Sequence, residues 1–200
     1  LEQIIAEYIE SQNLQGKTIN ACFAIACPVD KDLVKLTNLP WQFSRSAIQK
    51  EFGFNKLLLI NDYTAIAHAV PHLTEDQKVK VGGGEPIDNR PISICGPGTG
   101  LGVANVIPVD GKWLSLGGEG GHVDFAPVDD QEISILEKLL QKYKHVSYEQ
   151  LLSGLGIEQI YKAICAIKGV EAVYESAPEI SAKALAKECE YCEMTLAQFC

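Results

Sequence analysis

The stretch "KLLLINDYTAIAHAV", residues 56–70, places an apolar run directly before a helical pattern. Its first part, 56–60, has the length of a strand and no polar alternation, which predicts a strand covered on both faces. Asn61 and Asp62 follow at the carboxyl end of that strand, where ligands bind in open α/β sheets. The stretch therefore predicts a strand, a polar edge and a helix in direct succession.

Strands and helices alternate on both sides of this unit. Apolar residues at helical spacing predict helices over 1–9 and 132–143, and again after Ser147. Apolar runs predict strands over 19–27 and 33–38. Strands mixed with helices and joined by short turns indicate an α/β protein.

Cap and turn residues mark further boundaries. Ser44 is predicted to cap a helix that runs through Glu51 and ends at Gly53. The polar stretch 74–90, which contains "GGGEP", is typical of a hinge or lobe boundary. Residues 91–109, "PISICGPGTGLGVANVIPV", predict a strand, a glycine turn and a second strand.

Composition excludes two classes of partner. The net charge of −9 over 200 residues argues against nucleic acid, whose phosphates require a concentrated basic surface. No apolar run approaches the length of a membrane span, and no signal peptide is visible. The chain opens on Leu1 inside a helical pattern, so we expect an internal piece of a longer protein.

The seven cysteines are typical of a reducing cytoplasm, since most lie in apolar strand or helix contexts. Cys189 and Cys192 form a C-x-x-C pair, a spacing found in redox and metal sites. The surrounding residues have helical apolar spacing, and no second Cys or His pair lies nearby. A structural role is therefore favoured over a metal site, and no metal ligand is assigned.

Asp62 is the first candidate catalytic residue. A carboxylate at a strand end can take the proton of a substrate hydroxyl during attack on phosphorus. The alternative is that Asp62 caps the following helix, a position that favours Asp. Spacing alone favours the cap, although one carboxylate oxygen can cap a helix while the other faces a ligand.

The turn "GPGTGLG", residues 96–102, is the second candidate. Its glycines can present backbone N–H groups to phosphate oxygens, with the Thr99 hydroxyl as a further donor. It lacks the Gly-Lys-Ser/Thr ending of a Walker A loop, and a strand rather than a helix follows it. A tight hairpin that needs glycine for positive φ explains the pattern equally well.

The loop "SLGGEGGHVDFAP", residues 115–127, is the third candidate. Glu119 and His122 are too few for an independent metal site. Carboxylate and imidazole groups pair well with the hydroxyls of a sugar or polyol. A packing or surface role is the common alternative for such a histidine. A base, a phosphate loop and a polyol-binding loop together indicate a sugar kinase.

The chain resembles the bacterial-type ATP-dependent glucokinases in six segments, which occur in the same order with similar spacing over essentially its whole length. The segments are "FAIACPV", "LTNLPWQFS", "INDYTAIAHAVP", "GPGTGLGVA", "GEGGHVDFAP" and "HVSYEQLLSGLGI". The resemblance implies the two-lobed hexokinase/actin-like (ribonuclease H-like) ATPase fold, incomplete at both termini. Residues 1–72 would belong to the small α/β lobe and 73–200 to the large α/β lobe.

The resemblance also implies a role for each candidate residue. Asp62 would be the catalytic base that takes the proton of the glucose 6-hydroxyl. The residues that would hold the ring hydroxyls are Asn61, Glu119, His122 and Glu149. The residues that would form the second phosphate loop of the fold are Gly98, Thr99 and Gly100, of which Gly100 would also lie near the sugar. The glycines of 115–127 would let Glu119 and His122 approach the sugar closely.

The implied reaction is transfer of the γ-phosphoryl group of ATP to D-glucose, with Mg²⁺ carried by the nucleotide. A cytoplasmic homodimer is expected. The first phosphate loop of the family and its adenosine-binding segment are missing, so we expect the 200-residue piece alone to be inactive. The alternatives are a kinase of the same fold for another hexose or polyol, and a non-catalytic sugar sensor.

Overall fold

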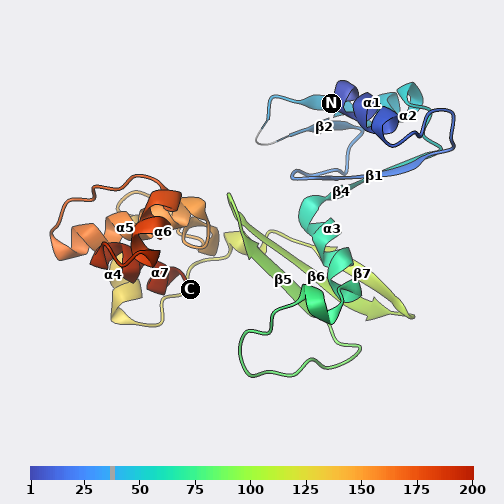
Figure 1. Ribbon diagram of the computed structural model, residues 1–200. Coiled ribbons are helices and arrows are strands. Elements are labelled where there is room, and N and C mark those ends of the chain that lie inside the picture. Colours follow the sequence, from blue (N-terminus) through green and yellow to red (C-terminus); the bar gives the residue numbers. More distant parts are fainter. Residues whose placement is uncertain (37–38) are drawn as a thin grey trace. The chain divides into compact units, whose positions relative to one another are not determined.

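The computed structural model describes residues 1–36 and 39–200 (Figure 1). The chain forms two compact units, each of which consists of two separate segments of the sequence. Unit 1 comprises Leu1–Ile92 and Asn105–Gly117, and unit 2 comprises Ser93–Ala104 and Gly118–Cys200. The assignment of 1–72 and 73–200 to two lobes stays a prediction.

Unit 1 is built on a parallel pair of strands, β1 (Asn20–Ile25) and β4 (Lys56–Asn61). Ile25 is aligned with Asn61, so the carboxyl ends of both strands meet at one edge. A parallel pair needs a crossover connection, and here the crossover contains the helix α2 (Arg45–Glu51). This arrangement places Asn61 and the residue after it at a strand edge, as the sequence predicts.

One hydrophobic core holds the two strands against α2 and the N-terminal helix α1 (Glu2–Ser11), which confirms the predicted helix over 1–9. Its buried members are Ile5, Cys27, Val34, Phe43, Ile48, Phe54, Leu57 and Leu59.

The prediction that 56–60 is covered on both faces is wrong for the described residues. Leu57 and Leu59 are buried, but Leu58 between them is 46% exposed. Successive side chains of a strand point to opposite faces, so only one face is covered.

Ser44 caps α2 as predicted, because its hydroxyl accepts a hydrogen bond from the Ala47 N–H at 3.1 Å. Gly53 follows the helix with a φ of +62°, the left-handed conformation that ends a helix at low cost. A short antiparallel pair, β2 (Leu33–Lys35) and β3 (Gln42–Ser44), precedes α2. The strand predicted over 33–38 thus ends at Lys35, and residues 37 and 38 lie outside the described residues.

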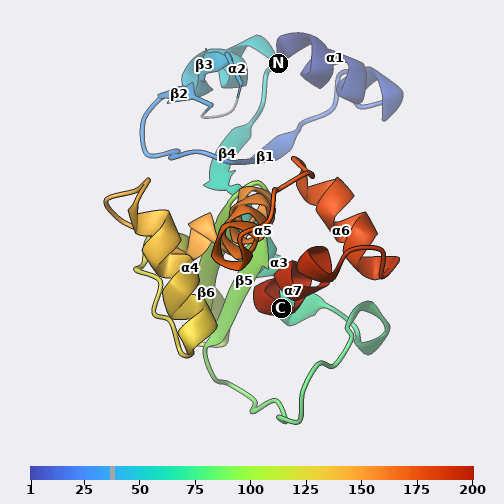
Figure 2. The ribbon, with the colours of Figure 1, turned by 90° about the vertical axis from the view of Figure 1, so that its left-hand side faces the viewer.

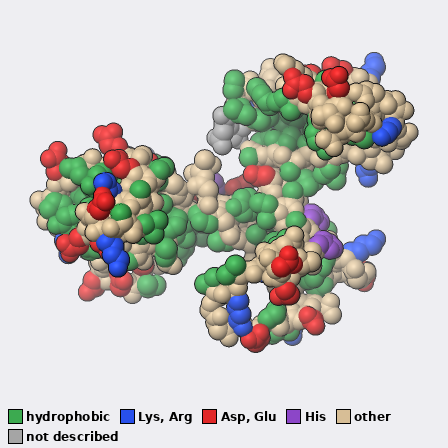
Figure 3. Space-filling view, in the orientation of Figure 1, with side chains coloured by type: hydrophobic (Ala, Val, Ile, Leu, Met, Phe, Trp, Pro, Cys, Tyr) green, Lys and Arg blue, Asp and Glu red, His purple; other side chains and the backbone are tan. Residues whose placement is uncertain are grey.

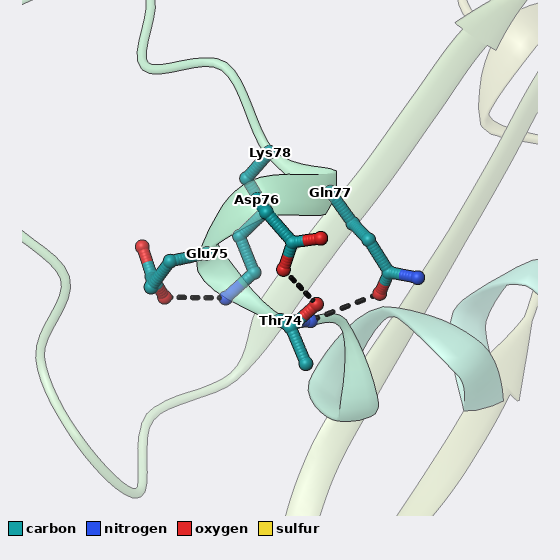
Figure 4. A network of polar contacts seen from close by, with 5 residues as sticks. All are labelled: Thr74, Glu75, Asp76, Gln77 and Lys78. Carbon is teal, nitrogen blue, oxygen red and sulfur yellow. Dashed lines mark hydrogen bonds and ion pairs between the residues drawn. The ribbon is translucent and has the colours of Figure 1, made fainter.

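Helix α3 (Asp62–Ala69) follows β4 directly, and a long connection then runs to residue 91. Apart from the short turns η1 (Val70–His72) and η2 (Glu75–Gln77), this connection has no regular structure. Figure 4 shows how Thr74 closes η2: its N–H donates to Gln77 Oε1 at 3.0 Å and its hydroxyl donates to Asp76 Oδ1 at 2.5 Å. The polar stretch predicted as a boundary is therefore an exposed loop with one ordered turn.

A three-stranded sheet has the order β5-β6-β7, with β5 over Ile92–Pro97, β6 over Leu101–Val109 and β7 over Lys112–Gly117 (Figure 1). The predicted strand, glycine turn and strand over 91–109 are confirmed. Strand β7 was not predicted, since its last residues were assigned to the loop over 115–127. Within unit 1, α3 packs against β7.

Unit 2 contains four α-helices among its described residues, and Figure 2 shows them as a group. They are α4 (Asp130–Leu140), α5 (Gly154–Lys168), α6 (Ala177–Leu185) and α7 (Glu190–Phe199). Helix α5 packs against each of the other three. Acidic side chains are spread over this helical group on the face seen in Figure 3. No helix of the described part of the chain is long and apolar enough to cross a membrane.

Candidate functional site

Asn61, and not Asp62, caps helix α3. Asn61 Oδ1 accepts hydrogen bonds from the N–H groups of Tyr63 at 3.0 Å and Thr64 at 3.3 Å. The alternative that Asp62 is the cap is therefore wrong, because Asp62 is the first helical residue. With its carbonyl oxygen used by the cap, Asn61 can offer a ligand only the two N–H donors of its amide.

Asp62 is half-buried at the same strand edge, and its Oδ1 accepts the Tyr63 N–H at 2.9 Å. That bond fixes one carboxylate oxygen and leaves Oδ2 for a ligand. Cys27, which follows the neighbouring strand β1, is buried nearby. Burial, and then the negative charge of Asp62, raises the pKa of the Cys27 thiol. The two parallel strands therefore bring a carboxylate and a thiol to one edge.

The turn from Gly98 to Gly100 joins β5 to β6 in unit 2. Neither glycine has a positive φ, so the hairpin interpretation does not explain why glycine is needed here. The Gly98 N–H donates to the Gly100 carbonyl at 2.7 Å, which removes it from the predicted row of phosphate donors. The turn offers a phosphate the amides of Thr99 and Gly100 and the exposed Thr99 hydroxyl.

Glu149 joins this turn to the loop after β7. It lies in the turn η4 (Tyr148–Gln150), and its Oε2 accepts the Leu101 N–H at 2.9 Å. Its other oxygen, Oε1, lies 3.6 Å from His122 Nδ1. On the far side of the imidazole, His122 Nε2 lies 3.7 Å from Glu119 Oε2. Both separations exceed a hydrogen bond, so neither carboxylate oxygen is saturated by the imidazole.

Gly100 is glycine because Glu149 needs its space. A Cβ added at Gly100 would overlap the Glu149 carboxylate. The same carboxylate is held by the next amide of the chain, that of Leu101. Gly100 thus sets the position of a charged group that lies far away in the sequence.

Packing also explains the glycines of the loop between Glu119 and His122. This segment forms the turn η3 (Gly120–His122), which lies against strand β6. A side chain at Gly120 would overlap the side chain of Val103, and one at Gly121 would overlap the Leu101 carbonyl. Packing alone therefore requires glycine at Gly120 and Gly121, and the expectation that the glycines of this loop allow a close approach to the sugar stays a prediction.

A short pairing that the sequence analysis missed holds Glu149 in place. Asp124 and Ser147 form an isolated antiparallel bridge. A backbone hydrogen bond flanks it on each side. The Phe125 N–H donates to the Val146 carbonyl at 2.9 Å, and the Tyr148 N–H donates to the Val123 carbonyl at 3.0 Å. Phe125 and Tyr148 stack edge to face with centroids 5.5 Å apart. The alternation in "HVDF" and "HVSY" was a signal for this pairing.

The structure thus brings Gly100, Glu119, His122 and Glu149 together within unit 2. Asn61 and Asp62 lie side by side in unit 1, and their cooperation with the first group stays a prediction. Among residues 1–36 and 39–200, no group of three His, Cys, Asp or Glu side chains is arranged to hold a metal ion. The acids and the histidine of unit 2 are exposed or half-buried groups that suit a ligand rich in hydroxyls.

Comparisons with known proteins agree with this chemistry. A sequence model of the Glucokinase family matches residues 1–200. The glucokinase of Colwellia psychrerythraea is 50% identical over 205 residues, and that of Photorhabdus laumondii is 45% identical over 202 residues. Each of these alignments covers 100% of this chain and 62% of the relative, so the chain spans less than two thirds of their length.

Solved structures give the same result. The crystal structure of glucokinase from an Antarctic psychrotroph matches with a TM-score of 0.88 and 38% identity, over 100% of this chain and 62% of that one. A glucokinase from Balamuthia mandrillaris, solved in complex with glucose, matches with a TM-score of 0.72 at 22% identity, covering 99% and 62%. The second match supports the fold alone.

Proposed function

The chain belongs to the glucokinase family, and from this premise we propose that the intact protein phosphorylates D-glucose on its 6-hydroxyl with ATP. The observation that carries the proposal is the position of Glu149. One of its carboxylate oxygens is held by the backbone at the glycine turn, and the other faces His122. A fixed carboxylate beside an imidazole is suited to bind adjacent sugar hydroxyls, because each hydroxyl both donates and accepts.

Asp62 is the proposed general base. Its Oδ1 is fixed by the Tyr63 N–H, and Oδ2 would accept the proton of the 6-hydroxyl as that oxygen attacks the γ-phosphorus. The amide of Asn61, oriented by its cap, would donate to a neighbouring hydroxyl. Such a base contributes about 10²–10⁴-fold to the rate.

The turn from Gly98 to Gly100 is the proposed phosphate contact. Its donors are the amides of Thr99 and Gly100 and the Thr99 hydroxyl, all on exposed or half-buried residues. These neutral donors suit phosphate oxygens whose charge is balanced by Mg²⁺, which ATP would carry between its phosphates. The ion would supply charge neutralisation, and the residues described here would orient the phosphate.

The test uses the full-length protein that contains this chain. ATP-dependent phosphorylation is measured over glucose, mannose, fructose, N-acetylglucosamine and glycerol, with Asp62→Asn as the variant. Asp88→Asn, an exposed carboxylate of the loop after α3, is the matched control. We expect glucose to dominate, and we expect Asp62→Asn to retain glucose binding while kcat falls at least 10²-fold.

Two other results would contradict the proposal. Preference for another acceptor would indicate a kinase of the same fold with a different substrate. Glucose binding without turnover would indicate a sugar sensor, and Asp62 would then have no catalytic role.

We further propose that the intact protein is a cytoplasmic homodimer, a state that sedimentation of the full-length protein would test.

A further inference from the structure

The C-x-x-C pair lies at the start of helix α7, outside the residues proposed to bind glucose or ATP. Cys189 is the N-cap residue of α7, and Cys192 lies in its first turn. Residues three apart in a helical turn project from the same side, so the two thiols are neighbours. Cys192 is 0% exposed, whereas Cys189 is half-buried. One thiol is therefore open to a reagent in solution, and the other lies directly behind it.

The pair is part of a larger cluster of thiols in unit 2. Cys165 on α5 is buried in the same hydrophobic core, together with Tyr161, Ile180 and Ala184. Among the described residues this cluster has no arrangement that would hold a metal ion. Dithiol chemistry is thus the reaction that the geometry allows.

We infer that Cys189 and Cys192 form a reversible disulfide, with Cys189 as the attacking thiol and Cys192 as the resolving thiol. The oxidant is a low-molecular-weight disulfide of the glutathione type, RSSR. The Cys189 thiolate attacks one sulfur of RSSR, which forms a mixed disulfide and releases RS⁻, protonated to RSH. The Cys192 thiolate then attacks Cys189 Sγ and releases the second RSH. Two thiols lose two electrons and two protons, and RSSR gains both.

The surroundings of Cys192 determine the rate of the second step. Burial, and then the hydrogen bond to Cys189, raises the pKa of the Cys192 thiol to about 12. Because only the thiolate attacks, ring closure is slow at neutral pH and accelerates about tenfold per pH unit below that value. A thiol of high pKa is also a poor leaving group, so the disulfide resists reduction once it has formed.

The experiment exposes the full-length reduced protein to graded ratios of oxidised to reduced glutathione, traps thiols by alkylation and maps them by mass. Cleavage after glutamate separates Cys189 from Cys192 at Glu190, so their two fragments stay joined only if the disulfide has formed. We expect that joined product, formed about tenfold faster at pH 8 than at pH 7. It should be absent in Cys189→Ser and unchanged in Cys95→Ser, an exposed thiol on β5.

Several results would overturn the inference. Cys189 and Cys192 could both remain fully alkylated at the most oxidising ratio. Cys189 could stop at the mixed disulfide, or it could pair with Cys165 or Cys200 instead. Because Cys192→Ser places a hydroxyl in the core and destabilises unit 2, the half-buried Cys189→Ser is the decisive variant. None of these readouts depends on kinase activity, so they stand independently of the proposed function.

Discussion

The Glu149 carboxylate occupies the place that a side chain at Gly100 would fill, and the Leu101 N–H holds it there at 2.9 Å. The obstruction at Gly100 is the far end of a flexible side chain. Enlarging Gly100 would therefore move Glu149 without breaking the fold. Enlarging Gly121 would instead press on the Leu101 carbonyl, which belongs to the backbone of β6.

We predict that Gly100→Ala lowers kcat/KM for the sugar about 10- to 100-fold, because displacement of a binding group by about 1 Å costs that much. Its melting temperature should stay within about 2 °C of the parent protein, since less than about 1 kcal/mol is lost. Gly84→Ala in the exposed loop after α3 is the matched control, because a Cβ there meets nothing within 4 Å. Sugar kinetics and thermal melts of the three full-length proteins measure both effects. An unchanged kcat/KM in Gly100→Ala would contradict the steric role.

Unlike Gly100→Ala, Gly121→Ala should lower the stability of the protein. The added methyl group meets a main-chain carbonyl that cannot rotate away, so we expect about 1–3 kcal/mol of destabilisation. Urea unfolding of the full-length protein measures the loss. A variant as stable as the parent would show that η3 can shift away from β6 at little cost.

Asn61 allows the helix cap and the sugar contact to be separated. Asn61→Asp keeps an oxygen for the N–H groups of Tyr63 and Thr64 but removes the amide donors. We expect its stability to match the parent and its KM for glucose to rise about tenfold or more, the cost of one lost hydrogen bond. Asn61→Ala should lose both the helix cap and the amide donors to the sugar, and loss of the cap should lower the free energy of unfolding by about 1 kcal/mol. Equal KM values for Asn61→Asp and the parent would exclude a donor role.

The thiol cluster predicts a loss of stability at alkaline pH. The pKa of the buried Cys192 is about 12, raised from a reference of 9.0, so the unfolded chain releases this proton first. The contribution is fully present below pH 9 and is lost as the pH rises toward 12, by up to about 1.4 kcal/mol per pH unit. Urea unfolding of the reduced protein between pH 8 and 10.5 measures how fast the free energy of unfolding falls with pH. This fall should be less steep for Cys192→Ala than for the parent protein, and it should be unchanged for Cys95→Ala.

Features governed by neighbours in the sequence could be predicted. The strand and helix on either side of Asn61, and the Ser44 cap of α2, depend on residues within a few positions. The choice between Asn61 and Asp62 as the cap could not be made, because both residue types favour that position. Strand β7 was missed because the glycines after it gave the whole segment the character of a loop.

The candidate site was predicted as a set of residues but not as an arrangement. Glu119, His122 and Glu149 were named, and the structure does place them together. The reason for Gly100 was not visible, since it depends on a side chain from a distant segment. The pairing beside Asp124 was missed although "HVDF" and "HVSY" alternate, because a four-residue alternation does not show which distant segment it pairs with.

The first backbone N–H group of α5 makes a hydrogen bond outside the helix. The first N–H groups of a helix have no partner inside it, yet the Gly154 N–H donates to the Gly98 carbonyl at 2.9 Å. Its protection from hydrogen–deuterium exchange therefore depends on the glycine turn and not on the helix. A single backbone resonance would thus report, in solution and without any substitution, whether a nucleotide displaces the turn that we propose to contact its phosphates.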